Sequence, residues 1–184
     1  MALSRSLLSL ALLAPLLVAA ALLAAGDRAP ADVPDPIRAP PGERLVLAAH
    51  ASGFQIYVCT PSGDGKLQWT LKAPEAQLRD GRGTLIGRHF AGPSWRYKDG
   101  SEVTGKAVAR VDAPDPQAIP WLLLSAVAHT GSGLLEQVTS IQRIHTHRGL
   151  PPPAAQCNAA RRDVEVRSPY SADYFFYAPA SGDR

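Results

Sequence analysis

Short apolar segments alternate with polar turns along most of the chain. The segments are rich in β-branched and aromatic residues, and clusters of Gly, Pro, Asp and Ser separate them. They span residues 43–51, 53–60, 66–74, 84–92, 94–111, 119–130, 134–147 and 172–179. This composition and spacing are typical of antiparallel strands. The pattern predicts a mostly β fold, an antiparallel β-sandwich or flattened β-barrel, with room for one short helix.

Finer features of the pattern place individual residues. Because side chains alternate along a strand, Gln55, Tyr57 and Cys59 should share one face. Asp99-Gly100 predicts a β-hairpin with a type I′ turn, which needs positive φ at both central residues. Residues 119–130 form a continuous apolar run that fits either a short buried helix or a central strand.

The first 42 residues differ from the rest. Residues 7–25 carry no charged side chain, follow Arg5 and end in small residues, which is typical of a secretory signal peptide over residues 1–26. An uncleaved anchor is the alternative. Residues 27–42 hold many prolines, which predicts an extended tether, so we expect a single β domain over residues 43–184.

Two cysteines, Cys59 and Cys157, make up the whole cysteine content. In an oxidising compartment, a single pair predicts one disulfide. The net charge is only +3, and the basic residues are scattered among acidic ones. We therefore expect no nucleic acid partner, and no stable membrane insertion once the leader is removed.

Several phrases of the chain resemble a known family. They are GFQIYVC at 53–59, Trp69 with Leu71 and APEAQL at 73–78, GRHFAGPSW at 87–95 followed by KDGS, IQR at 141–143, and Cys157 with YSADYFFY at 170–177. In this order they resemble the exported bacterial and fungal family known as domain of unknown function 3455, over about residues 33–179. The resemblance implies no established activity. After IQR the family usually has Asn-Thr and two glycines, whereas this chain reads IHTHRGL.

Histidines are the candidate metal ligands. His145 and His147 are two residues apart, so on a strand both imidazoles would point to one face, a spacing that suits Zn²⁺ or Cu²⁺. His89 is a candidate third ligand if the fold brings it near. Without a third ligand, the two histidines are simply exposed residues at a strand end, and no cofactor is otherwise predicted.

Aromatic residues suggest two candidate ligand sites. His89, Trp95 and Tyr97 flank a Gly-Pro turn, so His89 can face Trp95 across neighbouring strands and form a small pocket. The alternative is that Trp95 plugs the end of the fold and His89 caps it. A second group could stack on a glycan, although strand alternation buries part of it: Tyr170, Tyr174, Phe175, Phe176 and Tyr177.

The sequence contains no G-x-S-x-G elbow, H-E-x-x-H motif or P-loop. The leading hypothesis is therefore a non-catalytic binding domain, in the periplasm or outside the cell, for a small ligand or glycan. The alternatives are a metal-assisted enzyme or metal-binding protein and a structural envelope-associated protein. The sequence leaves the oligomeric state open.

Overall fold

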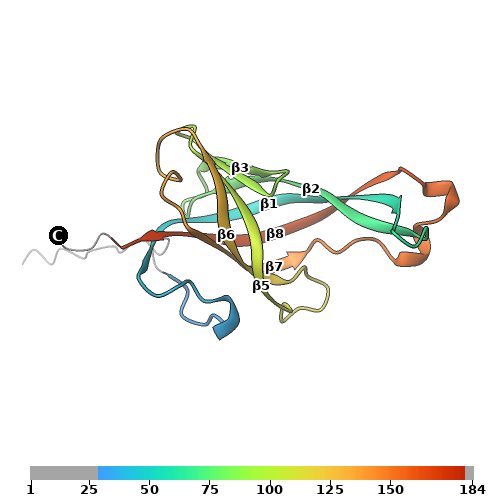
Figure 1. Ribbon diagram of the computed structural model, residues 1–184, viewed down its shortest axis with the longest axis horizontal. Helices are drawn as coiled ribbons and strands as arrows, with labels where there is room; N and C mark the ends of the chain where they lie inside the picture. Colours follow the sequence, from blue (N-terminus) through green and yellow to red (C-terminus); the bar gives the residue numbers. More distant parts are fainter. Residues whose placement is uncertain (1–28, 181–184) are drawn as a thin grey trace, which may run out of the picture.

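The computed structural model describes residues 29–180. Within them, eight antiparallel strands hydrogen-bond in chain order and close into a barrel (Figure 1). The strands are β1 (Glu43–Pro61), β2 (Leu67–Arg79), β3 (Leu85–Phe90), β4 (Ser94–Tyr97), β5 (Glu102–Val111), β6 (Trp121–Thr130), β7 (Ser140–Arg148) and β8 (Glu165–Pro179). The predicted mostly β fold is confirmed, and the sheet closes as a barrel.

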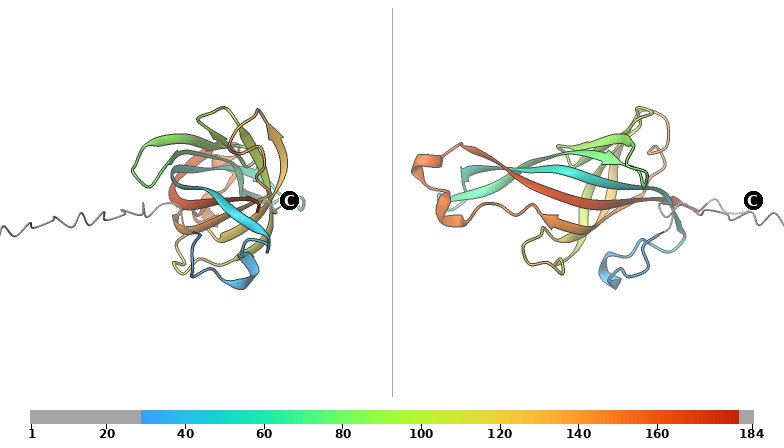
Figure 2. Two further views of the ribbon diagram at one scale, coloured as in Figure 1. Left: turned by 90° about the vertical axis from the view of Figure 1, so that its left-hand side faces the viewer. Right: turned by 180° about the vertical axis from the view of Figure 1, so that it is seen from behind.

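Strands β1, β2 and β8 are long and extend beyond the barrel as an arm (Figures 1 and 2). Strand β1 pairs with both neighbours far along the arm, since Tyr57 lies opposite Leu71 on β2 and Val166 on β8. The segment between β7 and β8 covers the end of the arm and contains two 3-10 turns, η2 (Ala154–Gln156) and η3 (Ala159–Arg161).

The predicted disulfide lies on this arm. Cys59, near the end of β1, is bonded to Cys157, which follows η2, and their Cα atoms are 5.4 Å apart. The bond closes a loop with a sequence separation of 98 residues. It therefore ties the arm to the β7–β8 segment.

Alternation along the strands separates an inner face from an outer face. Gln55, Tyr57 and Cys59 are all buried, as the alternation predicted. The largest fully buried aromatic side chains of the barrel core are Trp95, Tyr174 and Phe176. Burial of such side chains supplies most of the favourable free energy of folding.

The Pro-rich segment is not the extended tether that the sequence predicted. Residues Asp35–Ile37 form a 3-10 turn, η1, and Val33 and Ile37 are buried in a cluster with Trp121 and Ile144 on the outside of the barrel. The buried amide of Gln142 donates to the carbonyl of Ile37 over 2.6 Å. Proline suits the start of this turn because it lacks an amide proton there. The predicted signal peptide lies outside the described residues.

Two local predictions are resolved. Residues 121–130 of the ambiguous apolar run form strand β6. Asp99-Gly100 does connect two strands, but only Gly100 has positive φ there, at 93°. Tyr97 N donates to Ser101 O over 2.9 Å, which closes a three-residue loop in place of the predicted type I′ turn.

Helical structure in residues 29–180 is limited to the three 3-10 turns. Across that range no helix has the length and apolar character needed to cross a membrane.

Candidate functional site

A short hairpin creates an opening in the barrel wall. Strand β3 pairs with only the last part of β2, from Ala76 to Arg79, and β4 pairs with only the first part of β5, from Glu102 to Thr104. The β3–β4 hairpin therefore ends, at its tip Gly92-Pro93, before it fills the space between β2 and β5. Beyond this tip, a gap separates β2 from β5. A cavity lies at this gap and reaches into the barrel.

The cavity has a volume of about 420 Å³. Sites for small organic ligands typically have volumes of about 300–1,000 Å³. Its wall is mainly apolar, with a few polar side chains from β1, β2, β3, β7 and β8. The lining residues that matter below are Gln55, Pro74, His89, Trp95, Ala107, Leu122, Leu124, Arg143 and Tyr174.

His89 and Trp95 meet as the sequence analysis expected. They lie directly opposite each other on β3 and β4, and their rings stack with centroids 4.4 Å apart and planes within 5°. The ring of Tyr174 packs edge-on against both, with centroid distances of 5.1 and 5.3 Å. This aromatic cluster forms the inner end of the cavity.

The imidazole of His89 is neutral. Burial lowers its pKa to about 3, and the positive charge of Arg143 acts in the same direction. Nδ1 lies 2.8 Å from the carbonyl oxygen of Ser94. Because a carbonyl oxygen only accepts, Nδ1 carries the proton and Nε2 is left as an acceptor.

Three buried polar atoms around the cavity have no hydrogen-bond partner within the described part of the chain: Gln55 Nε2, Trp95 Nε1 and Tyr174 Oη. Gln55 is only 2% exposed and Tyr174 is fully buried. Nearly all buried polar groups in proteins have partners, and an unpartnered one costs about 1–3 kcal/mol. Donors of this kind can be satisfied by a molecule that accepts hydrogen bonds.

Arg143 adds a positive charge to the same wall. It is half-buried on β7, and its Nε and Nη2 both donate to the carbonyl of Pro120, over 3.2 and 2.8 Å. Among residues 29–180 it forms no ion pair with a carboxylate. The sequence analysis missed both Gln55 and Arg143 as site residues.

Tyr97 does not join this site. It lies on β4, half-buried against the side of the barrel core, and the ammonium group of Lys98 lies 5.6 Å from its ring centroid. It lines a shallow surface depression with Arg88 and Arg96 instead.

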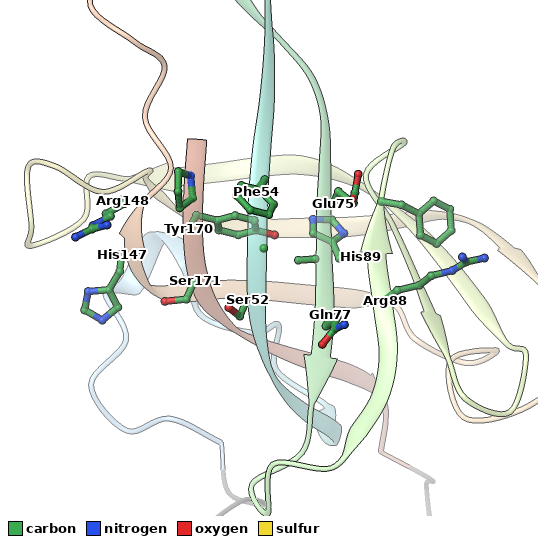
Figure 3. A pocket seen from close by; sticks show the side chains of 14 residues that line it. Ser52, Phe54, Glu75, Gln77, Arg88, His89, His147, Arg148, Tyr170 and Ser171 are labelled. Carbon is green, nitrogen blue, oxygen red and sulfur yellow. The ribbon is translucent and has the colours of Figure 1, made fainter. Parts of the chain in front are cut away.

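A second, wider hollow of about 880 Å³ crosses the outer face of β8, β1, β2 and β3 (Figure 3). His147 and Arg148 lie on one side of it, and Arg88 and His89 on the other. Half of its lining residues are exposed, and Glu75 is already paired with Arg167 over 2.9 Å. It lacks the enclosure of the barrel cavity, which is therefore the stronger candidate.

The candidate metal ligands are not brought together. His145 has positive φ, at 49°, and its Nδ1 bonds Asp173 over 2.8 Å, while His147 lies in the outer hollow and His89 in the core. The described residues contain no group of three or more His, Cys, Asp or Glu side chains arranged to hold a metal ion.

The aromatic run of β8 forms no exposed stacking platform. Tyr170, Tyr174, Phe176 and Tyr177 are all buried, and only Phe175 is partly accessible. Strand alternation sends Tyr174 and Phe176 into the barrel. Tyr177 is also buried, and its hydroxyl donates to Gln142 on β7. A glycan would therefore have to bind elsewhere on the molecule.

Comparison with known families gives one match. A family model described as protein of unknown function (DUF3455) matches residues 40–178, which is most of the chain. No curated protein and no solved structure matches the chain.

Proposed function

We propose that this chain, which belongs to the DUF3455 family, is an exported, non-catalytic protein that binds a small organic ligand in its barrel cavity. The observation that carries the proposal is the set of unpartnered donors on Gln55, Trp95 and Tyr174 around an otherwise apolar cavity. Apolar walls with a few convergent polar groups are typical of ligand sites, and small β-barrels can hold one small ligand.

The ionisation of the cavity supports binding more than catalysis. A general acid or base works best with a pKa near the working pH. Burial lowers the pKa of His89 to about 3 and raises the pKa of Tyr174 above its usual value. Both groups therefore hold one protonation state through neutral pH, and Arg143 stays charged.

Export is supported by two features. The Cys59–Cys157 disulfide is of a kind that persists in oxidising compartments. The charge-free run at residues 7–25 has the character of a secretory leader. Together they favour the periplasm or the exterior of the cell as the place where the ligand is met.

A neutral fluorescent probe tests the cavity. N-phenyl-1-naphthylamine brightens in apolar sites, and we expect saturable binding by the purified protein. Ala107 lines the cavity mouth and is exposed, so Ala107→Trp should block entry without disturbing the core. We expect this variant to bind the probe at least about tenfold more weakly, which is about 1.4 kcal/mol.

The neighbouring Val108 provides a matched control. It is 60% exposed and lies outside the cavity lining, so Val108→Trp should bind the probe as the parent protein does. Unchanged binding by Ala107→Trp would overturn the assignment of the cavity. The proposed function would be overturned if the parent protein showed saturable binding neither to this probe nor to 1-anilinonaphthalene-8-sulfonate.

A further inference from the structure

The structure also points to the class of ligand. Resting on the proposed function, we infer that the ligand is a small organic acid whose carboxylate binds Arg143, with its apolar body among Leu122, Leu124 and Trp95.

The first argument is the missing counter-ion. Arg143 lines the cavity, and among the described residues no Asp or Glu lines it. The other cation there, Lys72, is already paired with Glu165 on the exposed arm. A half-buried guanidinium without a carboxylate keeps an uncompensated charge, which an anionic ligand would neutralise.

The second argument is the fixed direction of the guanidinium. Both hydrogen bonds to Pro120 O come from one edge of the guanidinium, which uses the Nε proton and one of the two Nη2 protons. They leave Nη1 and the second Nη2 proton without a carbonyl or carboxylate acceptor among the described residues. Two parallel N–H groups of this kind match the two oxygens of a carboxylate.

The third argument is that the charge acts at the inner end of the cavity. Burial raises the pKa of Tyr174 and lowers that of His89, and the charge of Arg143 lowers both. Arg143 lies directly opposite Tyr174 in the pairing of β7 with β8, and both side chains line the cavity.

The donor set favours a monoanion. Gln55 Nε2 can donate two hydrogen bonds and Tyr174 Oη one, and Arg143 supplies a single positive charge. This satisfies a carboxylate, whereas a phosphate dianion would leave charge unbalanced in a mainly apolar cavity. The apolar residues then surround the rest of the ligand.

A matched pair of competitors tests this inference. Naphthalene-1-acetate and naphthalene-1-acetamide share one aromatic body and differ in charge. We expect the acid to displace N-phenyl-1-naphthylamine from the parent protein at a concentration at least about tenfold lower than the amide. Arg143→Gln should bring this acid-to-amide ratio to about one, and Arg143→Lys should retain part of the preference because it keeps the charge.

Arg110→Gln is the control for the loss of a surface charge, since Arg110 lies on β5 outside the cavity lining and is largely exposed. We expect it to keep the parental ratio, and a thermal melt of each variant establishes that it is folded. If the acid and the amide displace the probe from the parent protein at equal concentrations, the inference is overturned. Saturable binding of the probe would still support the proposed function in that case. A preference for the acid that survives in Arg143→Gln would also overturn it.

Discussion

Three residues of the cavity bury polar groups at a cost in folding free energy, and the same groups are available to contact a ligand. Gln55, Trp95 and Tyr174 each bury a polar atom that has no partner within the described residues. Apolar side chains of similar shape would avoid that desolvation cost. Groups that break this rule are expected at functional sites, where other parts of the fold compensate for them.

Two tyrosines on β8 allow a direct test of this cost. Tyr174 Oη forms no hydrogen bond of normal geometry within the described residues, whereas Tyr177 Oη donates to Gln142 Oε1 over 2.6 Å. We expect Tyr174→Phe to leave the free energy of unfolding within about 0.5 kcal/mol of the parent value or to raise it. Tyr177→Phe should lower it by about 1–2 kcal/mol, because it strands the buried Gln142 oxygen. Urea denaturation measures both, and an equal loss in the two variants would contradict the assignment of Tyr174.

His89 predicts a dependence of stability on pH. Its folded pKa of about 3 lies below the unfolded value of about 6.5, so the unfolded chain binds one more proton between these values. The stabilisation is complete above pH 6.5 and falls by about 1.4 kcal/mol per pH unit as the pH drops toward 3. Tyr174 packs against His89, and burial raises the pKa of its hydroxyl, so this neighbour stays protonated in this range.

His89→Asn isolates this contribution, because Asn retains a donor for Ser94 O and does not titrate. We expect the variant to be less stable at pH 7 and to lose less stability between pH 6 and pH 4. The difference in slope should correspond to about one proton. Urea denaturation at several pH values measures it, and parallel curves for the two proteins would show that His89 is not neutral in the folded state.

At the scale of elements, the sequence predicts what depends on local pattern. Alternation placed Gln55, Tyr57 and Cys59 on one buried face, and the Gly-rich and Pro-rich turns marked the strand ends. The run at 119–130 stayed ambiguous because an apolar run suits any buried element. The turn at Asp99 took another form because the hairpin closes with one left-handed residue, Gly100, instead of two.

What the sequence could not show depends on partners distant in the chain. The Pro-rich segment packs because Val33 and Ile37 find a surface formed by Trp121 and Ile144, which no local pattern reveals. In the sequence, Arg143 cannot be distinguished from other charged strand residues. Only the closed barrel places it beside a cavity whose described lining contains no Asp or Glu. The stacked His89 and Trp95 were predictable because a hairpin turn lies directly between them.

At the scale of the whole molecule, the barrel and the arm have separate roles. The cavity lies in the barrel, between β2 and β5. The disulfide fastens the arm formed by β1, β2 and β8, which extends beyond the barrel in Figure 1. Neither Cys59 nor Cys157 lines the described cavity. The disulfide should therefore support the stability of the fold and not the affinity for the ligand.

Replacing both cysteines by alanine separates these two roles. The disulfide closes a loop with a sequence separation of 98 residues, for which the chain-entropy model gives about 4–5 kcal/mol of stabilisation. We expect urea denaturation of the double variant to show a loss of that order, with an unchanged dissociation constant for N-phenyl-1-naphthylamine in the absence of urea. Weaker probe binding by a variant that is still folded would place the binding site on the arm. A loss of stability below about 1 kcal/mol would show that the open chain is already compact when unfolded, since the disulfide acts mainly by restricting that state.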